Sequence, residues 1–459
     1  MTHNVHITPD NVHSTLGKHI LTDGMSMVLD LDKSKGPYIF DARSNRFLLD
    51  FFTFFASNPL GMNHPKLVEN EAFRDKIGRV AIHNPSNSDI YSREMAEFVE
   101  TFSNIGIPDY LPHAFFIAGG GLGVENALKA AFDWKVQKNY EKGYRTDKGH
   151  KILHFDEAFH GRTGYTMSLT NSQPVKIARF PKFDWPRVKN PKMVFPMDEK
   201  NTADVITREN EAIAQAERYF ELNKDDIAAI IIEPIQGEGG DNHFRPEFHR
   251  ALRELADRHE ALLIYDEVQT GVGLTGKFWA HEHYVKPDII AFGKKAQVCG
   301  MLAGKRLDEV ENNVFNVASR LNSTWGGNLV DMVRFSRYLE VIEEEDLVTN
   351  AAKSGAYLQK KIGELIGEFD FINNARGRGL MCAFDFAETE YRDTFLPLVF
   401  ENGVLIHPSG SRTLRFRPPL NTQPEQIDEG IDIIRKTLIE TRDRFPGLKD
   451  TFAVIDEVK

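Results

Sequence analysis

The chain has little that would suit a disulfide framework, a membrane or a nucleic acid. Only two of its 459 residues, Cys299 and Cys382, are cysteines, too few for a disulfide-stabilised secreted scaffold and typical of a reducing cytoplasm. No apolar run approaches the ~20 residues that span a bilayer, and the N-terminal residues lack the pattern of a signal peptide. A net charge of −11 disfavours nucleic-acid binding, which needs a basic surface. Together these features predict a cytoplasmic protein with neither membrane nor nucleic-acid partners.

Several well-known catalytic motifs are also absent. The sequence contains no GxSxG elbow, no P-loop and no HExxH helix, which argues against the serine hydrolases, nucleotide hydrolases and zinc proteases that depend on them. No set of Cys and His residues has the spacing of a metal site, so we expect no metal.

The middle of the chain alternates short apolar runs with helical patterns. The runs 113–117, 151–155, 228–232, 261–266 and 288–292 are dense in Ile, Leu and Phe, as expected for strands buried on both faces. Residues 246–260 between two of them have a helical pattern. From about residue 70 to 320 we therefore predict an α/β region with a mostly parallel sheet.

The two ends of the chain have other patterns of predicted helices and strands. Beyond about residue 330 two long helices lead to strand-like segments near residues 381–386, 404–408 and 413–418, and then to a last helix over 424–445. Residues 38–52 predict two strands around a turn at Ser44 and Asn45. We predict three regions: an N-terminal arm with strands that join the smaller domain, a large domain and a C-terminal α+β domain, with the bounds 1–70, 71–325 and 326–459.

Several predicted strands end in residues that can carry chemistry. Glycines 119–121 lie between a strand and a helix, so their amides could bind a phosphate at the helix N-terminus or merely form a tight turn. Asp266 follows an apolar run, either as a solvated carboxylate or as a buried partner for a heteroaromatic nitrogen. Lys294 and Lys295 end another run; they are an exposed pair, or one of them is a nucleophile with a depressed pKa.

Other polar residues are weaker candidates when taken singly. Phe159, His160 and Arg162 cluster after a strand, where an aromatic ring could stack on a cofactor and an arginine could bind a carboxylate. Glu238 lies in a glycine-rich loop. Alternation along a strand places Arg415 and Arg417 on one face.

In this order the segments resemble those of the class III aminotransferases, which use pyridoxal phosphate (PLP). The resemblance rests on seven motifs between about residues 38 and 440: AGGGLGVENALK, FHGRTG, EPIQGEGG, IYDEVQTGVGLTGKF, PDIIAFGK, STWGGN and LRFRPPL. It implies PLP-dependent fold type I, with a large domain around a mostly parallel seven-stranded sheet and a smaller α+β domain.

The resemblance also implies a role for individual residues. Lys294 falls on the Schiff-base position, and Asp266 falls on the partner of the pyridinium nitrogen. For the rest of the cofactor the implied contacts are Gln269 with the phenolic oxygen, Phe159 and His160 at the ring, Gly120 and Gly121 at the phosphate, and Thr324 of a neighbouring subunit completing the phosphate site. The last contact implies a homodimer with active sites at its interface. Lys295 has no implied role.

Within the class the chain is most similar to the lysine 6-aminotransferases, through segments that include FHGRTGYTMSLTN and FGKKAQVCG. This similarity implies transfer of the ε-amino group of L-lysine to 2-oxoglutarate. We expect Arg162 to bind the distal carboxylate of both substrates, Arg415 the α-carboxylate of 2-oxoglutarate, and Glu238 to pair with Arg415 while lysine is bound. Another ω-amino donor such as ornithine, or a PLP-dependent aminomutase, stays open as an alternative.

Overall fold

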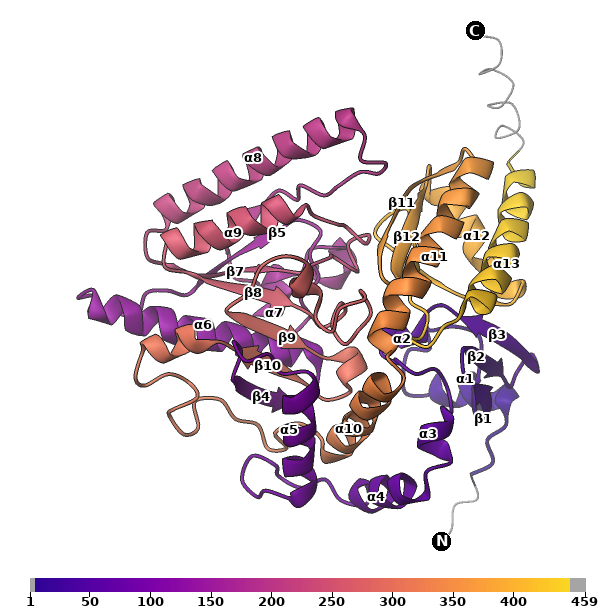
Figure 1. The fold of residues 1–459 in the computed structure, drawn as a ribbon, viewed down its shortest axis with the longest axis horizontal. Helices are drawn as coiled ribbons and strands as arrows, with labels where there is room; N and C mark the ends of the chain where they lie inside the picture. Colours follow the sequence, from indigo (N-terminus) through magenta and orange to yellow (C-terminus); the bar gives the residue numbers. More distant parts are fainter. Residues whose placement is uncertain (1–4, 446–459) are drawn as a thin grey trace.

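The computed structural model describes residues 5–445. The outer ends of the first and last predicted regions, 1–4 and 446–459, lie outside the described residues. Figure 1 shows two bodies side by side: a large α/β layer structure, and a smaller body in which the N-terminal strands lie against the C-terminal helices. Within residues 5–445, no helix combines the length and apolarity that crossing a membrane requires.

The large body is built on a seven-stranded sheet in the order β4-β10-β9-β8-β7-β5-β6. Strands β9, β8, β7, β5 and β6 are parallel, and β10 is antiparallel to both of its neighbours. The prediction of a mostly parallel seven-stranded sheet is confirmed. The bounds are β4 (His113–Ile117), β5 (Lys151–Phe155), β6 (Arg187–Val188), β7 (Ile227–Ile232), β8 (Leu262–Asp266), β9 (Ile289–Phe292) and β10 (Cys299–Ala303).

Helices cover both faces of this sheet, which explains why its strands are apolar throughout. Leu262 and Ile264 of β8 pack with Val124 and Leu128 of α6, whereas Leu263 and Tyr265 join the core on the opposite face. With a side-chain period of two, Asp266 at the end of β8 therefore belongs to the α6 side. The helices of this body are α4 (Glu71–Ala81), α5 (Arg93–Ile105), α6 (Gly120–Glu141), α7 (Thr166–Leu169), α8 (Glu199–Leu222), α9 (Pro246–Arg258) and α10 (Leu329–Glu344).

The smaller body contains two four-stranded sheets, ordered β1-β2-β3-β13 and β11-β12-β15-β14. The first unites the chain ends, because β13 pairs parallel with β3 through Val404 opposite Leu49. The turn predicted at Ser44 and Asn45 does separate β2 from β3. The strands are β1 (Leu29–Lys35), β2 (Tyr38–Asp41), β3 (Arg46–Asp50), β11 (Ile372–Arg378), β12 (Met381–Phe386), β13 (Val404–Leu405), β14 (His407–Ser409) and β15 (Thr413–Phe416).

Three long helices pack on these sheets, and three short ones lie in the N-terminal segment. The apolar side chains of the long helices, such as Leu358, Phe395 and Ile431, form one core with Phe384 and Phe416 of the strands. The bounds are α1 (Val12–Leu16), α2 (Thr53–Ala56), α3 (Pro65–Val68), α11 (Leu347–Glu368), α12 (Thr389–Glu401) and α13 (Pro424–Asp443).

Candidate active site

One cavity at the carboxyl ends of the parallel strands collects most of the residues predicted from the sequence. This edge is where open α/β sheets bind their ligands. Eight predicted residues line the cavity: Gly120, Gly121, Phe159, His160, Glu238, Asp266, Gln269 and Lys294. They come from segments up to 174 residues apart in the chain, which only the fold brings together.

Asp266 is a buried carboxylate held in a fixed orientation. Its Oδ2 atom lies 2.8 Å from His160 Nδ1, and its Oδ1 accepts a hydrogen bond from Val268 N at 3.0 Å. Both side chains are buried. Beside them, burial and the neighbouring Asp266 charge raise the pKa of Glu233 to about 7, against the opposing effect of His160. A carboxylate fixed in this way can accept a hydrogen bond from a protonated ring nitrogen.

The glycine turn opens helix α6. Gly119 has φ 105° and precedes the first helical residue, so Gly120 and Gly121 contribute N–H groups that have no partner within the helix. A Cβ atom at Gly120 would lie 2.8 Å from Val268 Cγ1, so any side chain there would require Val268 to shift. The turn therefore brings bare backbone donors and the positive end of the helix dipole to the cavity.

Lys294 follows strand β9 and reaches into the cavity. Its backbone has φ 51°, a conformation uncommon outside glycine and found often at functional sites. Desolvation and the Arg415 guanidinium lower the pKa of Lys294 to about 8, while Glu238 opposes the shift. At neutral pH a useful fraction of its amine is therefore unprotonated, as an attacking or proton-accepting amine requires.

Lys295 is not an exposed companion of Lys294, which was one of the two readings of the pair. Its side chain is buried, and Nζ donates hydrogen bonds to Ala56 O at 3.0 Å and Gln269 O at 2.8 Å. The two adjacent lysines thus point to different surroundings. Lys294 faces the cavity, whereas Lys295 points away from it and binds the backbone carbonyls of Ala56 and Gln269.

The segment held by Lys295 is a left-handed turn. Thr53, Phe54, Phe55 and Ala56 have φ of 42°, 52°, 60° and 65°, and each residue in this conformation costs roughly 1–2 kcal/mol. Polar contacts hold the turn: Asp50 Oδ1 accepts from Thr53 N at 2.7 Å, and Thr53 Oγ1 donates to Arg417 O at 2.7 Å. The turn places the Phe55 ring 5.9 Å from Lys294 Nζ and 5.7 Å from Arg415 Cζ.

Arg415 and Arg417 point to the same side, as alternation along the strand predicts, and both are buried. Arg415 Nη1 lies 3.0 Å from Glu238 Oε2. Arg417 grips Asp241 with two hydrogen bonds of 2.8 and 2.6 Å and donates to Gln269 Oε1 at 2.9 Å. Glu238, which was expected to pair with Arg415 while lysine is bound, lies against Arg415 in this structure.

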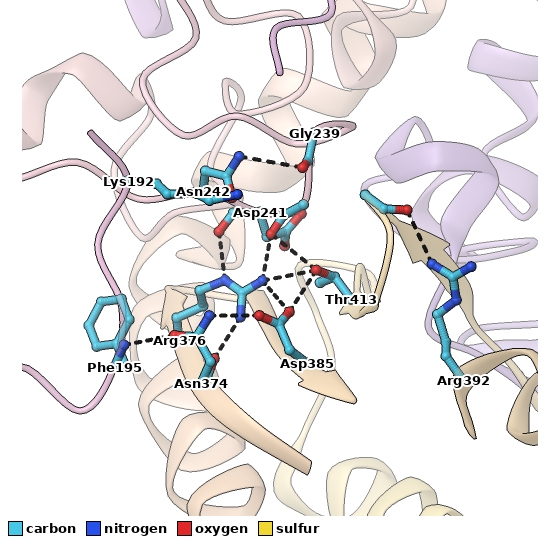
Figure 2. A network of polar contacts seen from close by, with 12 residues as sticks. Lys192, Phe195, Gly239, Asp241, Asn242, Asn374, Arg376, Asp385, Arg392 and Thr413 are labelled. Carbon is cyan, nitrogen blue, oxygen red and sulfur yellow. Dashed lines mark hydrogen bonds and ion pairs between the residues drawn. The ribbon is translucent and has the colours of Figure 1, made fainter. Parts of the chain in front are cut away.

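Just beyond Glu238 the glycine loop is anchored to the smaller body. Figure 2 shows Arg376 of β11 at the centre of this anchor. Its guanidinium donates to the carbonyl oxygens of Gly240 and Asp241 and to Asp385 Oδ1 at 2.7 Å. The backbone that follows Glu238 is therefore held in place.

Three predicted residues do not themselves line the cavity: Arg415, which pairs with cavity-lining Glu238, Arg162 and Thr324. Arg162 is exposed, although its neighbour Gly161 does line the cavity. Thr324 is exposed as well, in a segment that contacts Ser88 through the carbonyl of Ser323. Their assigned roles stay predictions, and the role of Thr324 involves a second subunit.

Other residues around the cavity were missed by sequence reasoning. Lys176 contacts Glu238, Asp241 pairs with Arg417, and the Phe55 ring lies 5.9 Å from Lys294 Nζ. Lys176 and Phe55 lie outside any chemical motif. A partial signal existed for Asp241, which directly follows EPIQGEGG.

Comparison with known proteins decides the family. Residues 21–438 match the model for the family Aminotransferase class-III. The protein is a class III aminotransferase. It is 53% identical to the L-lysine-epsilon aminotransferase of Mycobacterium tuberculosis over 94% of this chain and 96% of that one, and 47% identical to that of Amycolatopsis lactamdurans over 93% and 95%.

A solved structure agrees with this assignment. The lysine aminotransferase from M. tuberculosis in the internal aldimine form superposes with a TM-score of 0.93 at 52% identity, over 95% of this chain and 100% of that one. The aminotransferase has PLP-dependent fold type I, as predicted.

The donor set of the cavity fits PLP, the cofactor of this class. A ring nitrogen, an aldehyde and a phosphate need a buried carboxylate, an amine of lowered pKa and free backbone N–H groups. Asp266, Lys294 and the amides of Gly120 and Gly121 provide these in one cavity. Val268 and Phe159 supply its apolar walls.

Proposed function

We propose that this aminotransferase moves the ε-amino group of L-lysine to 2-oxoglutarate, giving 2-aminoadipate 6-semialdehyde and L-glutamate. The likeness to lysine-epsilon aminotransferases supports the donor. The observation that carries the acceptor is the Arg415–Glu238 pair beside Lys294. A buried arginine paired with a carboxylate can receive a second carboxylate when the first gives way, and so serve a donor with one carboxylate and an acceptor with two in turn.

Residues of this chain orient the cofactor ring and transfer the proton. PLP, when bound, supplies an electron sink for the carbon that loses its proton. Asp266, fixed by His160, holds the ring nitrogen in its protonated form. Lys294 would accept a proton at Nζ from the reacting carbon of the substrate and, as an ammonium, donate it again. Gln269 and Phe159 would position the ring and the glycine turn its phosphate, while the Phe55 ring lies 5.9 Å from Lys294 Nζ.

The two substrates use the arginines differently in this proposal. Arg162, next to cavity-lining Gly161, binds the lysine α-carboxylate and later the γ-carboxylate of 2-oxoglutarate. Arg415 stays paired with Glu238 while the apolar lysine chain is present, because an unpaired buried charge there would be costly. The α-carboxylate of 2-oxoglutarate then replaces Glu238 at Arg415.

We further propose a homodimer in a reducing compartment. Thr324 and Trp325 are exposed on one segment, and Trp325 keeps 50% of its surface accessible, a feature common in residues that a partner covers. This supports Thr324 as a phosphate ligand of the partner's site. Both cysteines are free thiols, which supports a cytoplasmic location.

A product assay tests the function directly. The enzyme loaded with PLP is incubated with L-lysine and 2-oxoglutarate, and L-glutamate and the cyclised semialdehyde, piperideine-6-carboxylate, are measured. We expect both products in equal amounts and none from Lys294→Ala. Faster turnover of ornithine than of lysine would reassign the donor, and lysine rearrangement without 2-oxoglutarate would indicate an aminomutase.

A further inference from the structure

Lys176 is a buried cation next to the active site to which the reaction described above gives no task. It ends a short turn, Pro174–Lys176, and its side chain is only 10% exposed. Its Nζ atom contacts Glu238 Oε1 and lies 5.1 Å from the centre of the Phe159 ring. A lysine ammonium is strongly hydrated in water, so its burial here requires a compensating partner.

Glu238 is that partner, and it is held from two sides. Its Oε2 atom meets Arg415 and its Oε1 atom meets Lys176. Burial alone would raise the pKa of Glu238, but the Arg415 and Lys176 charges lower it to about 2. The carboxylate is therefore fully ionised at neutral pH, and each of its oxygens has its own cation.

The backbone around Glu238 is fixed, so exchange at Arg415 has to occur by side-chain rotation. Gly237 N donates to Glu233 Oε2, and Gly410 N donates to Glu238 O, both at 3.0 Å. A Cβ atom on Gly239 would lie 2.1 Å from Glu157 O, and Arg376 grips the next two carbonyls (Figure 2). The residues next to Glu238 are packed too tightly for the loop itself to move.

We propose that Lys176 is a positioning residue that retains Glu238 when a dicarboxylate substrate occupies Arg415. The inference rests on the proposed function and extends it to the residue that makes the exchange possible. With lysine bound, one carboxylate bridges two cations. With 2-oxoglutarate bound, its α-carboxylate pairs with Arg415 and Glu238 pairs with Lys176. Every buried charge has a partner in both states, which is the condition for a low cost of exchange.

Removal of Lys176 leaves only the second state incomplete. Glu238 keeps Arg415 while lysine is bound, but when displaced it becomes a buried charge without a cation. Lys176→Met therefore selectively weakens binding of the diacid. The effect acts through Glu238, so it disappears when Glu238 is replaced by the neutral Gln.

Two probes separate the states in the holoenzyme without turnover. Glutarate has both carboxylates of the acceptor, and norleucine has the chain and α-carboxylate of lysine without its ε-amine. Dissociation constants are measured by titration calorimetry for the unmodified enzyme, Lys176→Met, Lys176→Arg, Glu238→Gln and the Lys176→Met/Glu238→Gln double variant.

We expect Lys176→Met to weaken glutarate binding by about 10- to 100-fold, the usual effect of leaving a buried charge unpaired, and to change norleucine binding by less than about threefold. Lys176→Arg, which keeps the positive charge, retains most of the glutarate affinity of the unmodified enzyme. In the Glu238→Gln background, Lys176→Met makes no further difference.

Two results would overturn the proposal. Equal weakening of both probes would make Lys176 a structural residue only, and weakening that persists in the Glu238→Gln background would mean that Lys176 binds the diacid directly. Failure of the proposed function is a separate result, seen as no glutamate from L-lysine and 2-oxoglutarate with the unmodified enzyme.

Discussion

Arg415 and Arg417 lie two residues apart, point to the same side and are both buried, yet their sites differ. Arg417 holds Asp241 through two hydrogen bonds, and the Asp241 side chain is 0% exposed. Arg415 shares Glu238 with Lys176 and has Phe55 beside it. Asp241 pairs with one cation, Arg417, whereas Glu238 pairs with two, Arg415 and Lys176. Whether an ion pair can be exchanged depends on the groups around it rather than on the pair itself.

The largest effect is expected from breaking the fixed pair. Arg417→Met leaves the Asp241 carboxylate buried without its cation, which costs about 3–5 kcal/mol. Chemical denaturation of the purified variant measures this loss. The matched control is the Arg417→Met/Asp241→Leu double variant, which removes both charges and should recover most of the free energy of unfolding. No recovery would mean that packing, not charge, is responsible.

Removing Arg415, whose carboxylate partner is exchanged, should affect function rather than stability. Arg415→Met leaves Glu238 paired with Lys176, so the free energy of unfolding changes by no more than about 1 kcal/mol. The value of kcat/KM for 2-oxoglutarate falls by about 10²- to 10³-fold, because a carboxylate loses its buried charged partner. Single-turnover kinetics with L-lysine should change by less than about tenfold. A similar loss in both half-reactions would contradict the distinction between the two arginines.

The glycine between the two carboxylates offers a smaller, sharper test. Gly240 has φ 128°, a conformation that side chains rarely adopt, so Gly240→Ala should cost about 1–3 kcal/mol of stability. If exchange occurs by side-chain rotation, kcat/KM for 2-oxoglutarate should change by less than about threefold. A large kinetic effect with unchanged stability would show that the loop moves as a whole.

The smallest effect concerns the pKa of Lys294. After desolvation, the Arg415 charge is the largest cause of its lowering to about 8, and Arg417 contributes less. Removal of a nearby positive charge favours the protonated amine, so Arg415→Met should raise this pKa more than Arg417→Met does. The pH dependence of Lys294 acetylation in the cofactor-free protein, followed by mass spectrometry, measures both. Equal shifts would contradict this ranking, because they would mean that the two arginines affect the pKa of Lys294 equally.

Much of this molecule could be predicted from local sequence. Apolar runs identified five strands of the large sheet, and strand ends identified Asp266 and Lys294 as candidates, because buried strands and ligand-binding edges have local signatures. Strands β6 and β10 escaped prediction, since β6 has only two residues and Gly300 weakens the apolar pattern of β10.

The pairings were harder, because partners come from segments far apart in the chain. Alternation placed Arg415 and Arg417 on one face, but only the fold assigns Asp241 to Arg417, 176 residues away. Lys295 shows the same limit, since its burial depends on the carbonyl of Ala56. Resemblance to a family named Glu238 but gave no reason to single out Lys176.

The left-handed turn Thr53–Ala56 has a consequence for the order in which the protein assembles. Four residues in this conformation cost roughly 4–8 kcal/mol together, so the turn cannot persist in a partly folded chain. Its contacts come from Asp50, Lys295 and the backbone of Arg417, which are brought together only when both bodies have docked. We therefore expect this turn to take its final shape among the last segments, so that the Phe55 ring comes to lie beside Lys294 and Arg415 only as folding finishes.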